Sequence, residues 1–304
     1  MKLKTKDLLT LNELDKKEIE EILNDAIKLK KDLKSGIYKP LLKNKTLAMI
    51  FQKASTRTRV SFETGMYQLG GHALNLSHKE LQLARGETIE DTAKTLSRYV
   101  DIIMARVYSH AEVESLAKNA TVPIINGLSD SFHPCQILAD LMTIKEKKKK
   151  LSGLKLAWIG DGNNVCNSMI YGCMKTGIDI FIATPKGYEP DKNVVKESKK
   201  VGEIQLLNDP RLAVTDADVV VTDTFVSIHH QAINRTKDFL PKFQVNSSLM
   251  KKAKPDAIFL HCLPAKRGQE VTDSVIDGSQ SAVWDEAENR LHAQKSLMIS
   301  LLRV

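Results

Sequence analysis

The segment from Phe51 to Glu63 combines three hydroxyl side chains and two arginines at the point where a buried strand gives way to a helix. The apolar run 46–51 predicts the strand, and apolar residues at helical spacing over 60–69 predict the helix. Free backbone N–H groups and the helix dipole favour an anion at such a helix start. We therefore expect a phosphate socket built from these N–H groups and from four neighbouring side chains: Ser55, Thr56, Arg57 and Thr58.

A less specific interpretation of this turn also exists. Ser55 or Thr56 could simply cap the helix while Arg57 and Arg59 lie on its solvated face. Capping accounts for the hydroxyl groups but not for cations near the positive end of a helix dipole. The phosphate socket is therefore the preferred hypothesis.

Four further groups follow the carboxyl ends of predicted strands, which is where open α/β sheets bind their ligands. Each has an ordinary alternative: a strand-end arginine often only reaches solvent, a lone histidine is often structural, an aspartate can cap a helix, and a cysteine can fill a core. Asp223 could instead pair with a substrate ammonium. The groups are Arg106, His133 with Gln136, Asp223, and Cys262 in His261-Cys-Leu-Pro264.

The turn Gly160-Asp-Gly-Asn-Asn164 follows another predicted strand but is a poor dinucleotide fingerprint. Such a fingerprint would need glycine where Val165 stands, so NAD binding is disfavoured. Asn163 and Asn164 could each donate and accept hydrogen bonds to a ligand, or could supply a helix N-cap.

Alternating strand and helix patterns along the chain predict an α/β protein with parallel sheets. The first helix is expected over 15–34, and the charged run 146–150 separates two such series. We place the domain boundary there, giving domains 1–148 and 149–304, with the last helix (about 286–304) packing back on the first domain. The expected strands are 46–51, 73–76, 101–106, 122–126, 154–159, 178–183, 203–207, 218–222, 257–261 and 282–284.

Composition excludes several classes of protein. The 304-residue chain has 42% hydrophobic residues and a formal charge of +8. Its lysine runs contain few aromatic residues on which bases could stack, so a nucleic-acid-binding surface is disfavoured. The four cysteines form no Cys-x-x-Cys pair, which indicates reduced thiols and makes zinc improbable. Neither a signal peptide nor a membrane-spanning run is evident. A cytoplasmic enzyme is the expectation.

Taken in order, these motifs resemble the aspartate/ornithine carbamoyltransferase family over nearly the whole chain. Ser55-Thr-Arg-Thr-Arg59 resembles its phosphate-binding signature, Leu81-Gln-Leu-Ala-Arg-Gly-Glu87 its next loop, and His133-Pro-Cys-Gln136 its carbonyl-binding element. The ornithine branch is indicated by 160–164, by 183–190, by Asp223 with Ser227, and by 261–264. The resemblance implies two α/β domains, each with a mainly parallel sheet flanked by helices.

The resemblance also implies a reaction: transfer of a carbamoyl group from carbamoyl phosphate to the side-chain amine of L-ornithine, giving citrulline and phosphate in arginine metabolism. It implies no metal or organic cofactor, and a homotrimer or multiple of trimers. The implied catalytic residues are Arg106, His133 and Cys262. The implied carbamoyl phosphate ligands are Ser55, Thr56, Arg57, Thr58, Gln82 (from a neighbouring subunit), Arg106, His133, Gln136, Cys262, Leu263 and Arg290. The implied ornithine ligands are Asn164, Asp223, Ser227 and Ile228.

One departure leaves the acceptor more open than the reaction. The family's ornithine branch usually has Ser-Met-Gly where this chain has Ser227-Ile228-His229, and histidine restricts a backbone that glycine leaves free. Putrescine is the nearest rival acceptor, because Asp223 could also neutralise a diamine. Two alternatives of another class are a non-catalytic relative kept as a binding subunit and a basic nucleic-acid-binding α/β protein. The direction of flux, toward arginine or back to ornithine, stays open.

Overall fold

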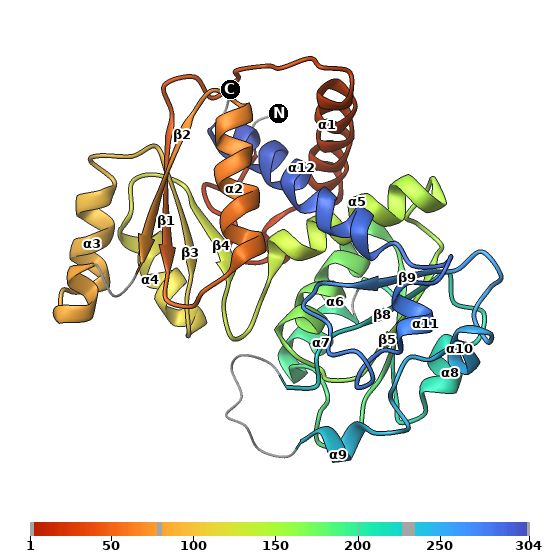
Figure 1. Cartoon of the computed structure of the whole chain (residues 1–304). Coiled ribbons are helices and arrows are strands. Elements are labelled where there is room, and N and C mark those ends of the chain that lie inside the picture. The colour runs from red at the N-terminus through yellow and green to blue at the C-terminus, as the bar shows by residue number, and fades with distance from the viewer. Residues whose placement is uncertain (1–2, 78–80, 200, 227–234, 303–304) are drawn as a thin grey trace. The chain divides into compact units, whose positions relative to one another are not determined.

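The computed structural model describes residues 3–77, 81–199, 201–226 and 235–302, which form two compact units (Figure 1). The first unit comprises Met1–Ala139 and Asn289–Val304, and the second comprises Asp140–Glu288. Each unit contains one parallel sheet flanked by helices, so the α/β prediction is confirmed. Within the described ranges, no helix is both long enough and apolar enough to cross a bilayer.

The sheet of the first unit has the strand order β2-β1-β3-β4, with all strands parallel. Strands β1, β3 and β4 are buried along nearly their whole length, as expected for a sheet covered on both faces. The strands are β1 (Thr46–Phe51), β2 (His72–Ser77), β3 (Ile102–Arg106) and β4 (Ile124–Leu128). The helices are η1 (Leu11–Glu13), α1 (Lys16–Lys34), α2 (Thr56–Gln68), η3 (Gln82–Arg85), α3 (Ile89–Leu96) and α4 (His110–Asn119).

Local sequence signals explain where several of these helices begin. Asp15 and Glu18 form a capping box at the start of α1, and the Thr88 hydroxyl caps α3. The N-terminal segment is held by the sheet, because the Leu8 N–H donates to the Ile124 carbonyl at 2.8 Å.

The second unit has the strand order β7-β6-β5-β8-β9, again all parallel. Its strands are β5 (Lys155–Ile159), β6 (Asp179–Ala183), β7 (Ile204–Leu207), β8 (Val219–Thr222) and β9 (Ile258–His261). Its helices are α6 (Asn164–Thr176), α7 (Lys192–Ser198), α8 (Pro210–Val214), α9 (Thr236–Phe239), α10 (Ser247–Met250) and α11 (Asp273–Ile276). Residues of α5 (Pro134–Lys148) and α12 (Val283–Leu302) belong partly to each unit.

The predicted strand at 282–284 is wrong. Ser281 makes a single bridge to Phe259, and the Ala282 N–H donates to the Phe259 carbonyl at 2.9 Å. The chain then turns into α12 at Val283, because the next amides find helical acceptors, beginning with the Glu286 N–H on the Ala282 carbonyl. The nine other predicted strands are confirmed, with bounds within two residues of those observed.

Candidate active site

The predicted phosphate socket lies at the N-terminus of α2, directly after β1. Ser55 is the N-cap residue, and its hydroxyl accepts a hydrogen bond from the Thr58 N–H at 3.3 Å. The capping interpretation is therefore correct for Ser55, while Thr56 stays exposed. Arg57 is half-buried, whereas Arg59 is exposed and donates to the Glu63 carboxylate at 3.0 Å. The two arginines thus differ in burial and in partner.

Arg290 joins this turn from α12, more than 200 residues along the chain. Its guanidinium donates to Gln136 Oε1 at 2.7 Å and to the Thr58 hydroxyl at 3.4 Å. All three side chains are almost completely buried. The structure therefore brings together three residues that the sequence placed in one site.

His133, one residue before α5, is buried at the same place. Burial lowers its pKa well below the usual value, and the positive charges of Arg290, Arg106 and Arg57 lower it further. The imidazole is consequently neutral at physiological pH. A neutral ring that lies among three guanidinium groups can donate a hydrogen bond to a carbonyl oxygen without adding to the local repulsion.

Arg106 reaches the same region because of strand register. It ends β3 and pairs with Phe51, the last residue of β1, so both strands deliver their ends to one edge of the sheet. The Gln52 N–H, just past β1, donates to the Arg106 carbonyl at 3.0 Å. Gln82, by contrast, is exposed on η3.

A hollow of 910 Å³ opens beside this turn. Its walls come from the ends of β1 and β2, from α2 and from the segment after β3. Ser55 and Thr56 line it, together with Arg59, Glu63 and Tyr108. It is much larger than a carbamoyl phosphate molecule needs.

The second unit contains a separate polar group built around Asp223. The sheet order β5-β8-β9 places three strand ends side by side: Ile159 pairs with Thr222, and Thr222 pairs with His261. Asp223 and Cys262, the next residues, therefore emerge as neighbours.

The buried Asp223 carboxylate accepts two hydrogen bonds from these neighbouring strand ends. One comes from the Cys262 thiol at 3.1 Å, and the other comes from Asn163 Nδ2 at 2.7 Å. Asn163 also caps α6, its Oδ1 accepting from the Val165 and Cys166 N–H groups at 3.0 and 3.1 Å. Asn163 is thus the cap, one of the two alternatives left open from sequence, and it is also a partner of Asp223, which the sequence did not predict. Asn164, the residue preferred from sequence, is buried in the first turn of α6.

Cys262 is a hydrogen-bond donor in this arrangement. Burial raises the pKa of its thiol well above the usual value, and the nearby carboxylates, Asp223 first, raise it further. The thiol therefore stays protonated at physiological pH. Leu263, the next residue, has a φ of 57°, a left-handed conformation that is unusual for a branched residue.

His261 could be taken for a metal ligand, because one ligand atom each from Asp223, His261 and Cys262 lie within 4.8 Å of one another. Both of its ring nitrogens are engaged, however. Nδ1 accepts from the Leu263 N–H at 2.9 Å, and Nε2 lies 3.2 Å from Glu270 Oε1. A metal would have to displace one of these buried contacts. Ser227, Ile228 and His229 lie outside the described residues.

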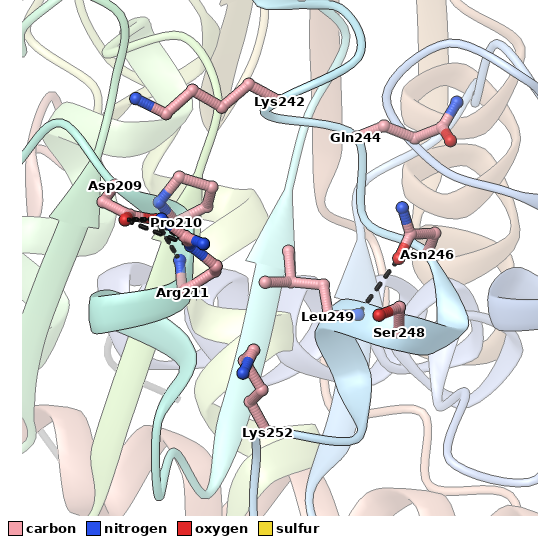
Figure 2. Close-up of a pocket in the computed structure, with 9 residues that line it drawn as sticks. All are labelled: Asp209, Pro210, Arg211, Lys242, Gln244, Asn246, Ser248, Leu249 and Lys252. Carbon is pink, nitrogen blue, oxygen red and sulfur yellow. Dashed lines mark hydrogen bonds and ion pairs between the residues drawn. The ribbon is translucent and has the colours of Figure 1, made fainter.

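A further hollow in the second unit, of 400 Å³, contains none of the sequence-predicted site residues (Figure 2). It lies between α8 and the segment that leads into α10. Lys242 and Lys252 line it together with Arg211. The Arg211 charge is already neutralised by Asp209, because its Nε donates to both carboxylate oxygens and its Nη2 donates to one of them. The Arg211 ion pair lowers the pKa of Asp209 to about 2. This hollow therefore attracts anions less strongly than a site with three unpaired cations would.

Comparison with known proteins identifies the class. The model of the aspartate/ornithine carbamoyltransferase carbamoyl-P binding domain matches residues 6–146, and the model of that family's Asp/Orn binding domain matches residues 152–301. The chain belongs to the aspartate/ornithine carbamoyltransferase family.

Its relatives point to one branch of that family. An ornithine carbamoyltransferase of Cenarchaeum symbiosum is 60% identical over 99% of both chains. An anabolic ornithine carbamoyltransferase of Pyrococcus furiosus is 57% identical over 96% of this chain and 95% of its own. The solved structure of the Pyrococcus furiosus ornithine carbamoyltransferase superimposes with a TM-score of 0.94, at 56% identity over 98% of this chain and 97% of that one.

Proposed function

We propose that this protein transfers the carbamoyl group of carbamoyl phosphate to the side-chain amine of L-ornithine, giving L-citrulline and phosphate. The observation that carries the proposal is the grouping of Arg290, Gln136 and Thr58 beside a neutral His133. This grouping supplies hydrogen-bond donors but no general base. It therefore suits a donor substrate whose own leaving group, the phosphate, can take up the proton of the amine. The names of the relatives support the same reaction.

The donor substrate is assigned to the first unit, and to residues 1–148 as a functional domain. The phosphate is bound by the α2 N-terminus with Ser55, Thr56, Arg57, Thr58 and Arg106. Arg106, His133 and Arg290, with Gln136 nearby, donate to the carbamoyl oxygen and stabilise the oxyanion that forms as the amine attacks. Because Gln136 and Thr58 hold the Arg290 guanidinium, little reorganisation is needed at that moment.

The acceptor is assigned to residues 149–304, excluding the last helix (about 286–304), most of which belongs to the first unit. Asp223 binds the α-ammonium of ornithine, and Asn164, Ser227 and Ile228 complete the amino-acid head site. Asn163 and the Cys262 thiol fix the orientation of the Asp223 carboxylate. An α-amino acid is preferred to putrescine because the amide groups on the β5–α6 turn can bind a carboxylate, which a diamine lacks.

The attacking amine must lose a proton before it reacts, since its ordinary pKa resembles that of lysine, about 10.4. Because the pKa of the Cys262 thiol is well above its usual value, the thiol stays protonated and is not assigned the role of a thiolate base. The thiol and the Leu263 carbonyl are assigned the role of orienting the amine, and the departing phosphate is assigned that of final proton acceptor. No metal or cofactor is required by this scheme.

The proposed assembly is a homotrimer or a multiple of trimers in the cytoplasm. The exposed Gln82 and the hollow beside Ser55 support it, because a hollow larger than the donor substrate leaves room for a residue from a second subunit. Gln82 of one subunit would then reach the phosphate held by another.

A product assay tests the proposal. Carbamoyl phosphate is offered with L-ornithine, putrescine, L-aspartate or N-acetylornithine in parallel, and the carbamoylated product is measured. Citrulline formation at the highest kcat/KM is the expected result. Preference for putrescine would leave the reaction type intact and replace the acceptor, whereas no product with any amine would remove the enzymatic assignment.

A further inference from the structure

A buried ion pair lies next to the acceptor carboxylate in the second unit and has no role in the scheme above. Asp161 stands on the β5–α6 turn, and its side chain is 6% exposed. Arg235 Nη2 donates to both of its carboxylate oxygens, at 3.1 and 3.2 Å. The Arg235 side chain is itself only 12% exposed. Burying two charges is costly, so such a pair calls for an explanation beyond surface solvation.

The pair is electrostatically linked to Asp223. Burial raises the pKa of Asp161 to about 7, Arg235 opposes this rise, and the negative charge of Asp223 adds to it. Asn163, two residues after Asp161, donates to Asp223 at 2.7 Å. The two carboxylates therefore share one poorly solvated neighbourhood, where like charges interact strongly.

Arg235 is held in place from its other side. Its guanidinium lies over the Tyr188 ring at 4.7 Å, and the Tyr188 hydroxyl donates to Asp238 at 2.6 Å. The Tyr188 carbonyl in turn accepts from the Gly162 N–H at 2.8 Å. Three segments of the second unit thus meet at this ion pair: the β5–α6 turn, the loop after β6, and the start of α9.

The charges of Asp161, Arg235 and Asp223 then add up to a definite sum. With Asp161 and Arg235 both ionised, their charges cancel, and Asp223 remains as one net negative charge for one substrate ammonium. Cys166 and Cys262 contribute none, because burial raises the pKa of both thiols well above the usual value. Without Arg235 the pKa of Asp161 would rise further, because Arg235 is the group that lowers it, and a protonated Asp161 would leave Asp223 as the one negative charge. Without Asp161 an unpaired guanidinium would repel the ammonium.

We propose that Asp161 and Arg235 are positioning residues for the acceptor, which set the net charge of the amino-acid head site by cancelling one another beside Asp223. The inference rests on the proposed use of an amino-acid acceptor. It predicts that removing the Asp161 charge weakens acceptor binding, that removing Arg235 alone does not, and that removing both restores it. A pair that only holds the fold together would not show this pattern.

The test measures the Kd of L-norvaline, which keeps the amino-acid head of ornithine and lacks the reacting amine, by calorimetry with saturating carbamoyl phosphate. Asp161→Asn is expected to raise the Kd about tenfold or more, because it leaves the Arg235 guanidinium unpaired, whereas Arg235→Gln should stay within about threefold of the unmodified protein. The double variant is expected to return to within about threefold of the unmodified protein. Arg211→Gln, which breaks the exposed pair with Asp209 in the same unit, is the matched control and should leave the Kd unchanged.

A double variant that binds no more tightly than Asp161→Asn would overturn the inference, as would an equal loss in Arg211→Gln. The unmodified protein supplies a second test that requires no variant to fold. Its norvaline affinity should rise between pH 6 and pH 8 as Asp161 ionises and cancels Arg235, and a flat profile would also overturn the inference. If the unmodified protein makes no citrulline, the proposed function fails instead, so the two failures are distinguishable.

Discussion

Arg57 and Arg59 are two residues apart on the same turn of α2, yet their surroundings differ. Arg57 is half-buried, and its charge helps to lower the pKa of His133, whereas Arg59 points to solvent and pairs with Glu63. Exposed ion pairs of this kind contribute little to stability. At the scale of single residues, burial and neighbours therefore distinguish two side chains of the same type.

The first prediction uses this pair of arginines. Arg57→Ala should lower kcat/KM for carbamoyl phosphate by about 10²–10³-fold, the usual cost of a lost transition-state donor, because it removes a charge from the phosphate socket. Arg59→Ala is the control, with an expected change below about threefold. Steady-state kinetics with saturating ornithine provide the measurement. Equal losses in both variants would contradict the separate roles given to them.

Asp223 permits a complementary prediction. Asp223→Asn should raise the KM for ornithine about tenfold or more and leave binding of carbamoyl phosphate nearly unchanged, because the carboxylate is assigned to the acceptor's ammonium. Direct calorimetric binding of each substrate separates the two effects. A loss confined to carbamoyl phosphate would reverse the assignment of the two units.

A further prediction concerns the protonation state of the Cys262 thiol. Since burial and Asp223 raise its pKa well above the usual 9.0, no thiolate ionisation should shape the rate between pH 6 and pH 9. Cys262→Ser keeps a donor for Asp223, so its kcat/KM profile should have the same pH midpoints even if its height changes. A midpoint that disappears in this variant would show that the thiol titrates during catalysis.

At the scale of elements, the strand ends decide which residues meet. Register pairs Thr222 with His261, so the next residues, Asp223 and Cys262, form a hydrogen bond although they are 39 positions apart. The β5–α6 turn joins them because β5 is the other neighbour of β8. A parallel sheet thus converts scattered motifs into one group at its carboxyl edge.

The β5–α6 turn also depends on a close approach of two backbones. A methyl group added at Gly162 would lie 2.2 Å from the Pro190 nitrogen, so Gly162→Ala should destabilise the fold by about 3 kcal/mol or more. Gly268→Ala is the comparison: it has a φ of 81° but open space, and should cost about 1 kcal/mol. Denaturant unfolding of both variants checks this, and equal costs would contradict the steric account.

At the scale of the whole molecule, the proposed assembly has a measurable consequence. Light scattering should give a mass of three times the 34.0 kDa chain, or a multiple of that. Mixing subunits that carry Gln82→Ala with subunits that carry Arg57→Ala should recover activity if Gln82 serves a neighbouring subunit, since some sites would then be intact. No recovery on mixing would place Gln82 in its own subunit's site or outside the site altogether.

The sequence by itself determined the features that depend on local chemistry. Strands rich in apolar residues, the helix start near Ser55 and Thr56, and the order of the motifs were readable because burial periodicity and helix capping act over a few residues. The expected strand at 282–284 was wrong because a local apolar pattern does not show how far pairing with a distant strand extends. Here the pairing is a single bridge between Ser281 and Phe259. The apolar residues of this segment instead open a helix.

Only the tertiary structure decided which contacts these residues make with one another. Arg290 meets Gln136 and Thr58 across separations of 154 and 232 residues, and Arg235 meets Asp161 across 74. It also singled out Asn163 as the partner of Asp223. Such contacts depend on strand order and on the packing of distant segments, and the resulting burial sets the protonation states of His133 and Cys262. No local pattern encodes that combination.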